Sequence, residues 1–141
     1  MKKKQDGFTL VELIVVIAIL GLLSTVSLVS FRGTQIKSRD VQRKNDLAQI
    51  QKALELYYND YKQYPLSIPA GGGSWQDANQ TLYMKEVPQD PKFGNYSFAS
   101  DGTYYVLYAR LENEEDPQFK EELGTDCGGE TCNYAVSSPN Y

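Results

Sequence analysis

The residues that could do chemistry are few, and most of them stand near the two ends of the sequence. The chain has no histidine, which removes the most common general base and the most common metal ligand. It contains neither a Gly-x-Ser-x-Gly elbow nor a phosphate-binding loop. The residues that stand out are Glu12, inside an apolar segment, and the two cysteines, Cys127 and Cys132. We therefore predict that the protein is not an enzyme, with a membrane-anchored enzyme that uses paired carboxylates as the remaining alternative.

Glu12 lies in an apolar segment that is long enough to cross a membrane. As a helix, residues 8–31 would extend about 36 Å, and a bilayer core requires roughly 20 apolar residues. A carboxylate at the centre of such a span costs about 2.5–3.5 kcal/mol, so Glu12 is a candidate functional residue. A cleaved secretory signal peptide and a plain signal anchor are the alternatives, and both leave Glu12 unexplained.

The residues around Glu12 are similar to a known processing site. The sequence Lys4-Gln5-Asp6-Gly7-Phe8-Thr9-Leu10-Val11-Glu12-Leu13 resembles the N-terminus of type IV pilins and type II secretion pseudopilins. In that family a prepilin peptidase cuts after the glycine and methylates the new N-terminal amine. The resemblance implies cleavage between Gly7 and Phe8, N-methylation of Phe8, and a role for Glu12 in assembly.

The chemistry of Glu12 agrees with that role. Phe8 and Glu12 are four residues apart, so a helix that included both would place them on one face. After cleavage, the amine of Phe8 is positively charged, and Glu12 could pair with it or with the amine of a neighbouring subunit. The resemblance implies the second arrangement, which would also fix the axial register between subunits.

The resemblance also implies the partners and the location. It indicates a structural subunit of a type IV pilus or a type II secretion pseudopilus, which polymerises with itself into a helical filament. The other expected partners are the prepilin peptidase, an inner-membrane assembly platform, minor pilins and the membrane. A minor pilin or binding subunit at a filament tip, for adhesion or DNA uptake, is the alternative. The net charge of −4 gives no support for nucleic-acid binding.

The orientation in the membrane is likewise implied by the resemblance and not by charge. Lys2, Lys3 and Lys4 precede the apolar segment, but five basic residues follow it soon after, so charge counting favours the opposite topology. The family places a single span in the inner membrane with the C-terminal domain outside the cytoplasm. Assembly then gives a periplasmic or extracellular filament.

The remaining sequence predicts an α+β fold in four parts. These are a leader at residues 1–7, a membrane or filament-core helix at 8–31, an amphipathic helix at 32–64, and a globular part at 65–141. One long helix from about residue 8 to residue 61 is expected, because apolar residues recur at spacings of three and four along its second half. This stripe consists of Leu47, Ile50, Leu54, Tyr57 and Tyr61, and Arg43 is expected on another face.

An antiparallel hairpin is expected at residues 95–111. Asp101-Gly102 predicts a type I′ turn. In the strand that follows, the side chains alternate between two faces, and one of these faces is expected to pack on the helix stripe. One face would carry Tyr104, Val106 and Tyr108, and the other Tyr105, Leu107, Ala109 and Leu111. Residues 67–80 are expected to form a loop anchored by the packing of Trp75.

The C-terminal region combines cysteines with carboxylates. Two cysteines without histidine make a poor zinc site, so a Cys127–Cys132 disulfide in an oxidising compartment is favoured over two free thiols. Residues 112–130 contain eight acidic side chains, which we interpret as a solvated surface. Major pseudopilins often bind calcium in this region, but the sequence matches no such loop residue by residue. We predict no cofactor and no metal, with calcium as the alternative that the carboxylates leave open.

Overall fold

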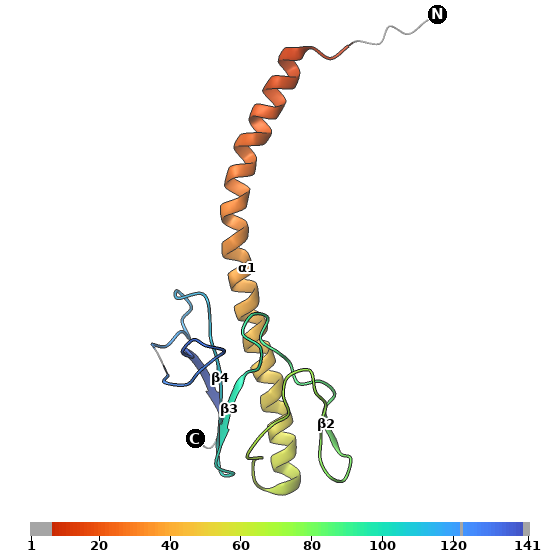
Figure 1. Cartoon of the computed structure of the whole chain (residues 1–141), viewed down its shortest axis with the longest axis vertical. Coiled ribbons are helices and arrows are strands. Elements are labelled where there is room, and N and C mark those ends of the chain that lie inside the picture. Colours follow the sequence, from red (N-terminus) through yellow and green to blue (C-terminus); the bar gives the residue numbers. More distant parts are fainter. Residues whose placement is uncertain (1–6, 122, 140–141) are drawn as a thin grey trace, which may run out of the picture. The chain divides into compact units, whose positions relative to one another are not determined.

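The structure is a computed structural model that describes residues 7–121 and 123–139, without the side chains of residues 26–30. The chain divides into an N-terminal unit, residues 1–36, and a head, residues 37–141. One helix and five strands are described: α1 (Leu10–Tyr61), β1 (Trp75–Gln76), β2 (Leu82–Met84), β3 (Ser97–Ser100), β4 (Tyr105–Ala109) and β5 (Tyr134–Ser137) (Figure 1). These elements confirm the predicted α+β class. The predicted leader lies outside the described residues except for Gly7.

Helix α1 begins and ends close to the predicted positions. It starts at Leu10, two residues later than expected, and ends at Tyr61. At its C-terminus Lys62 adopts a left-handed conformation (φ 55°), and its N–H donates to the carbonyl of Tyr58 at 2.8 Å. Within the described residues, no helix is long and apolar enough to cross a membrane. The predicted span at residues 8–31 includes residues 26–30, whose side chains are outside the described set.

The core of the head forms between the second half of α1 and a three-stranded antiparallel sheet of order β3-β4-β5. The predicted helix stripe is confirmed for Leu47, Ile50 and Leu54, each 0% exposed. Along β4, Tyr105, Leu107 and Ala109 are buried, and the residues between them are half-buried, as the two-residue period of a strand requires. This confirms the predicted packing of one hairpin face on the helix.

The connection between β3 and β4 contains Asp101-Gly102 as predicted, but the predicted type I′ turn is wrong. The last strand pair is Ser100 with Tyr105, so the connection contains four residues and is not a two-residue type I′ turn. Gly102 has a φ of 91°, whereas the φ of Asp101 is not positive. Instead, the Asp101 carboxylate accepts hydrogen bonds from the backbone N–H groups of Thr103 (2.8 Å) and Tyr104 (3.1 Å). A side-chain-stabilised turn thus replaces the expected backbone turn.

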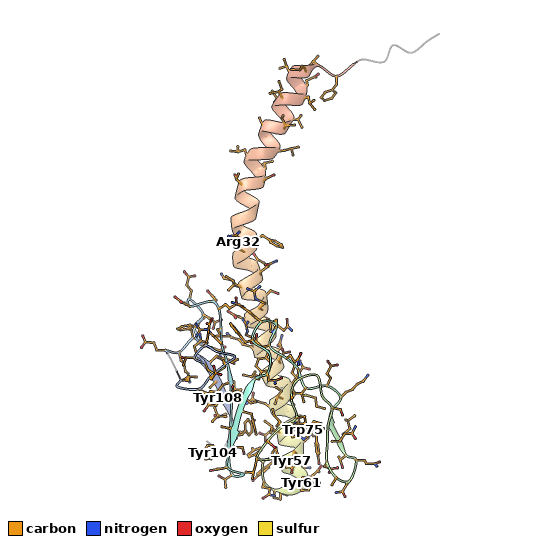
Figure 2. The ribbon with its side chains drawn as sticks, in the orientation of Figure 1. Arg32, Tyr57, Tyr61, Trp75, Tyr104 and Tyr108 are labelled. Atoms are coloured by element: carbon orange, nitrogen blue, oxygen red, sulfur yellow. A yellow bond between two sulfur atoms is a disulfide. The ribbon has the colours of Figure 1, made fainter. Side chains whose placement is uncertain are left out.

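Aromatic side chains gather where α1 ends (Figure 2). The predicted loop at residues 67–80 contains the short strand β1, which pairs with β2. Trp75 is 4% exposed and lies 6.0 Å from the ring of Tyr57 and 5.8 Å from that of Tyr83, so its predicted packing role is confirmed. Tyr61, the last residue of the stripe, stacks on Tyr57 at 4.5 Å but is 37% exposed.

Candidate functional site

The first turn of α1 is closed by a reciprocal pair of hydrogen bonds between Thr9 and Glu12. The Glu12 carboxylate accepts from the backbone N–H of Thr9 (2.9 Å) and from its hydroxyl (2.7 Å). The backbone N–H of Glu12 donates to the Thr9 hydroxyl oxygen at 3.3 Å. This is a capping box, in which Thr9 is the N-cap residue. Phe8 therefore precedes the helix, and the expectation that Phe8 and Glu12 share a helix face is wrong for the unprocessed chain.

The N-terminal unit leaves its apolar side chains uncovered. Twelve large apolar residues between Phe8 and Leu23 are 44–77% exposed, which contrasts with the buried stripe of the head. Such an area exceeds what a soluble monomer normally leaves in water, and it marks a surface that binds lipid or protein. No cation among the described residues pairs with Glu12, the single charge in this surface.

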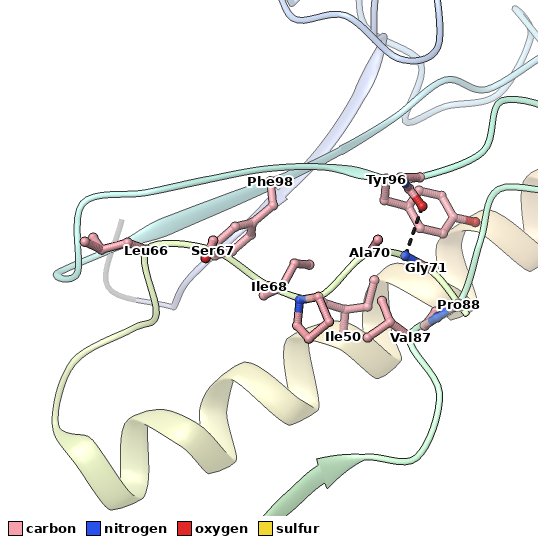
Figure 3. Close-up of a pocket in the computed structure, with 12 residues that line it drawn as sticks. Ile50, Leu66, Ser67, Ile68, Ala70, Gly71, Val87, Pro88, Tyr96 and Phe98 are labelled. Atoms are coloured by element: carbon pink, nitrogen blue, oxygen red, sulfur yellow. Dashed lines mark hydrogen bonds between the residues drawn. The ribbon is translucent and has the colours of Figure 1, made fainter. Parts of the chain in front are cut away.

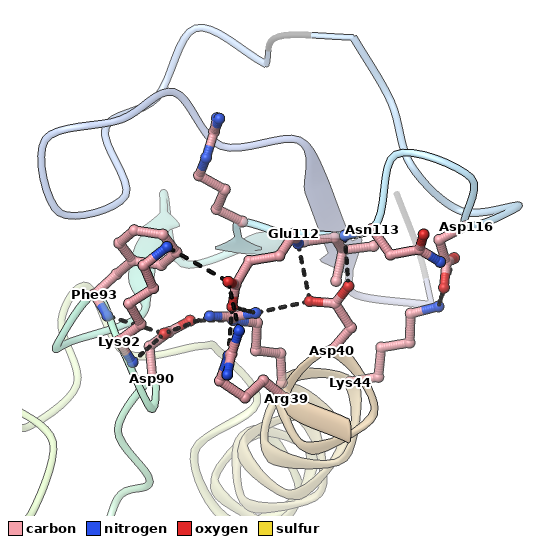
Figure 4. Close-up of polar contacts among 12 residues, drawn as sticks. Arg39, Asp40, Lys44, Asp90, Lys92, Phe93, Glu112, Asn113 and Asp116 are labelled. Atoms are coloured by element: carbon pink, nitrogen blue, oxygen red, sulfur yellow. Dashed lines mark hydrogen bonds and ion pairs between the residues drawn. The ribbon is translucent and has the colours of Figure 1, made fainter. Parts of the chain in front are cut away.

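The head contains the opposite arrangement, a cation enclosed by carboxylates (Figure 4). Arg43 is 0% exposed, and its guanidinium contacts Asp40 (2.7 Å), Asp90 (2.7 Å) and Glu112 (2.9 Å). Burial alone would lower the pKa of Arg43, but its hydrogen bonds to Asp90, Glu112 and Asp40 outweigh burial and hold the pKa above its usual value. The prediction that Arg43 lies on a face away from the core is wrong.

This ionic cluster of Arg43, Asp40, Asp90 and Glu112 connects the helix to two loops of the head. Asp40 accepts from the backbone N–H groups of Glu112 (3.0 Å) and Asn113 (2.8 Å), so a helix side chain fixes the loop that follows β4. The hydrogen bond from Arg39 lowers the pKa of Glu112 to about 2, and Arg43 adds to this effect against the influence of burial. Glu112 is therefore ionised at neutral pH.

Part of the acidic C-terminal region is neutralised by the helix. Glu112 pairs with Arg39 and Arg43, and the Asp116 carboxylate forms an ion pair with the ammonium of Lys44 at 2.7 Å. The interpretation of these residues as a solvated acidic surface is thus wrong for Glu112 and Asp116, whereas Glu114 and Glu115 are exposed. Among the described residues, no group of three or more side chains is arranged to hold a metal ion.

The two cysteines form the predicted disulfide, with their Cα atoms 5.2 Å apart. The loop that it closes packs against the segment that carries Asp90. Gly128 has a φ of 76°, and a Cβ atom there would lie 2.5 Å from the carbonyl oxygen of Phe93. The ring of Phe93 in turn lies under the Arg43 guanidinium, 5.3 Å from its carbon. The disulfide loop therefore contacts the ionic cluster indirectly, through Phe93.

The cluster was missed at the level of sequence, although one signal was present. Asp40 and Arg43 are three residues apart, a spacing that places opposite charges together on one helix face. Nothing local indicates that Asp90 and Glu112, which are far along the chain, meet the same guanidinium. Gly7, Phe8 and Glu12 lie together at the start of α1, far in sequence from the cluster.

Comparisons with known proteins agree with these features. A family model described as the prokaryotic N-terminal methylation motif matches residues 2–28. The type II secretion system core protein G of Klebsiella pneumoniae is 30% identical over 132 residues, which cover 86% of this chain and 94% of that protein. The protein of the same name from Aeromonas hydrophila is 30% identical over 112 residues, covering 73% and 78% of the two chains. That of Vibrio cholerae is 28% identical over 138 residues, covering 91% and 94%. No solved structure matches the chain.

The methylation motif and the core protein G similarity overlap in the N-terminal part of the chain. The motif covers the predicted processing site and most of the exposed apolar segment, and the similarity to core protein G also extends through most of the head. Both point to the same kind of protein. The chain belongs to the family of type II secretion pseudopilins that includes core protein G.

Proposed function

We propose that this chain is a structural subunit of a type II secretion pseudopilus, processed by a prepilin peptidase and polymerised through its N-terminal helix. The observation that carries the proposal is the exposed apolar surface of the N-terminal unit, which begins at Phe8, directly after Gly7, and surrounds a single carboxylate. A surface of this kind requires an apolar environment on all sides. The membrane provides it before assembly, and neighbouring subunits provide it in the filament.

The apolar surface alone does not decide between these two environments. Lipid tails are as apolar as leucine, so moving the helix from the bilayer to a filament core gains little from the hydrophobic effect. The transfer must then be favoured by packing and by polar contacts that lipid does not offer. Glu12 is the residue able to supply one, through the charged amine of Phe8 on an adjacent subunit.

Processing would change the surroundings of Glu12. In the unprocessed chain, Thr9 holds the Glu12 carboxylate through two hydrogen bonds. Cleavage between Gly7 and Phe8, followed by N-methylation of Phe8, creates a cation next to Thr9. A carboxylate accepts more than two hydrogen bonds, so Glu12 can retain its cap and also bind an amine. The repeated contact between identical subunits is heterologous and generates an open helical filament.

The location follows from the same proposal. The subunit would wait in the inner membrane with its head outside the cytoplasm, where a disulfide such as Cys127–Cys132 persists. The inner-membrane assembly platform would then extract it into the filament, and minor pilins would be its other neighbours.

The experiment that tests the proposal compares Glu12→Ala with Glu12→Gln in cells that express the secretion machinery. We expect both variants to enter the membrane and to lose the leader, which a mass shift reports, and both to fail to form filaments. Glutamine keeps a hydrogen-bond acceptor for Thr9 but removes the charge. Filaments from Glu12→Ala would refute the role of Glu12, and filaments from Glu12→Gln alone would assign it to the helix cap and not to the charge.

A further inference from the structure

The loop that follows β4 begins with a run of negative charge. The carboxylates at positions 112–116 are Glu112, Glu114, Glu115 and Asp116. Like charges this close repel one another, so the loop needs cations nearby to fold against the head. Calcium is one cation that could meet this need, because major pseudopilins often bind it in this region. It takes about six to eight oxygen ligands at roughly 2.3–2.6 Å.

The two carboxylates of this run that contact α1 are already paired with its cations (Figure 4). The Lys44 ammonium lies 2.7 Å from both oxygens of Asp116. The Arg39 guanidinium donates to the two oxygens of Glu112 at 2.7 and 2.8 Å. A metal ion at either carboxylate would have to displace these donors, and the other two carboxylates of the run are exposed. The residues present therefore do not fit a calcium site.

A cavity elsewhere in the head does not fit a metal ion either. It has a volume of about 310 Å³ and lies between the segment at residues 66–71 and the side chains of Tyr96 and Phe98 (Figure 3). None of the described residues that line it is charged. Since calcium sites are built from carboxylates and other oxygen ligands around a charge, the cations that hold the acidic loop are those of α1.

The backbone of the loop is bonded within the protein as well. The carbonyl of Asn113 accepts from the N–H of Asp116 at 3.1 Å, and the carbonyl of Asp116 accepts from the N–H of Phe119 at 2.9 Å. The Asp116 carboxylate also accepts from the N–H of Gln118 at 2.9 Å. Asp116 thus ends one turn and begins the next, so the cation that holds its side chain sets the position of both turns.

Lys44 is itself fixed by the core of the head. Its ammonium lies 5.6 Å from the centre of the ring of Tyr134, a buried residue of β5, and the face of an aromatic ring attracts a cation at this distance. The hydrogen bond from Lys44 holds the pKa of Asp116 below its usual value, so Asp116 is ionised at neutral pH. One ammonium therefore joins the helix, the acidic loop and the last strand, as a structural metal ion would.

We propose that the Lys44 ammonium is the structural cation of this loop and that the head folds without a divalent metal ion. A bound metal stabilises a fold only while its concentration is comparable to or above its dissociation constant, whereas an ammonium on the chain itself is always present. The stability of the head should therefore not depend on the calcium concentration of its surroundings. The proposal concerns the head alone and does not depend on processing or polymerisation, which involve the N-terminal unit.

The first test compares the unfolding of the full-length protein in non-ionic detergent micelles with excess EDTA and with millimolar calcium chloride. The fluorescence of Trp75, the only tryptophan, reports the unfolding of the head. We expect the urea midpoint to be the same in the two solutions. A lower midpoint in EDTA that calcium restores would overturn the proposal.

The second test removes the ammonium. Lys44→Met should speed hydrogen exchange at the amides of Gln118 and Phe119 about tenfold, since Asp116 loses the cation that holds it, while the amides of β4 keep their rates. The matched control is Lys52→Met, which removes an exposed ammonium further along the same helix and should leave all these rates unchanged. Exchange at the parent rate in Lys44→Met would show that the loop does not need this ammonium and would contradict the proposal.

Discussion

Glu12 and Arg43 lie on the same helix, in the N-terminal unit and in the head respectively, and they are the charges most removed from ordinary surface positions. Glu12 is surrounded by exposed apolar residues and is held only by Thr9. Arg43 is fully buried and contacts three carboxylates. Glu12 lacks a counter-ion within the described residues, whereas Arg43 has three.

This difference distinguishes the interactions that stabilise the folded monomer from those that are completed only when subunits assemble into a filament. A buried charge that is already paired within its own chain stabilises only when all its partners stay in place. A charge in an apolar surface without a counter-ion becomes favourable only when another molecule supplies one. Mutations at the ionic cluster should therefore change the stability of the head, and mutations at Glu12 should change assembly and leave the head folded.

The largest expected effect comes from Arg43→Met. Methionine keeps much of the side-chain length but leaves Asp40, Asp90 and Glu112 without a common cation, which should destabilise the head by about 3–5 kcal/mol. Urea unfolding of the full chain in detergent, followed by Trp75 fluorescence, measures this directly, since Trp75 is the only tryptophan and is buried. Part of the loss should be recovered at acidic pH, where the carboxylates become neutral.

Arg39→Met is the matched control for Arg43→Met. Arg39 also binds Glu112, at 2.7 Å, but its side chain is 31% exposed. We expect a loss of only about 1 kcal/mol or less, as for other exposed ion pairs. An equal loss of stability from both variants would show that the burial of Arg43 does not determine its contribution to the stability of the head. It would contradict the distinction drawn between Arg43 and Glu12.

The next effect concerns the pH dependence of stability. The pKa of Glu112 falls from its ordinary 4.5 to about 2 in the folded head, so its ion pairs stabilise the fold above pH 4.5. That contribution is lost as the pH falls from 4.5 toward 2. Burial raises the pKa of Asp46, so Asp46 affects stability in the opposite direction from Glu112. Protonation of Asp46 on acidification removes the free-energy cost of burying its charge.

The measurement compares the parent protein with Glu112→Gln between pH 7 and pH 2. The stability difference should be large at pH 7 and should shrink below pH 4.5, because the parent loses the ionised carboxylate that the variant never had. Glu114→Gln, at an exposed neighbour, should follow the parent curve throughout. Parallel curves for the parent and Glu112→Gln would mean that Glu112 is not the group responsible.

These residues also show what could be predicted from the sequence. The helix stripe at Leu47, Ile50 and Leu54 and the alternation along β4 follow from local periodicity, and both predictions are confirmed. The third strand, β5, was not predicted, because a four-residue strand after a glycine-rich loop has no periodic signal. The ionic cluster is not predicted for a related reason. An arginine is normally expected at the surface, and the two carboxylates that allow Arg43 to be buried, Asp90 and Glu112, are distant in sequence.

A smaller effect is expected from the disulfide. Replacing Cys127 and Cys132 together by serine opens a short loop, for which the chain-entropy model gives about 2 kcal/mol. Because Gly128 packs against Phe93, we also expect faster hydrogen exchange at the amides of Lys92 and Phe93, which the Asp90 carboxylate holds. A loss of stability without any change at these two amides would separate the disulfide loop from the ionic cluster.

The smallest effect is expected at the other end of α1. Thr9→Ala removes the side chain that caps the helix and contacts Glu12, which should cost about 1 kcal/mol of local helix stability. Because the N-terminal unit and the head are separate units, the urea midpoint of the head should not move. Hydrogen exchange of the full chain in micelles should become faster in the first turn of α1 alone. Thr9→Ser, which keeps the hydroxyl, should restore the parent rates. A shift of the head's unfolding midpoint in Thr9→Ala would show that the stability of the head depends on the N-terminal unit. It would contradict the expectation that changes around Glu12 leave the head folded as before.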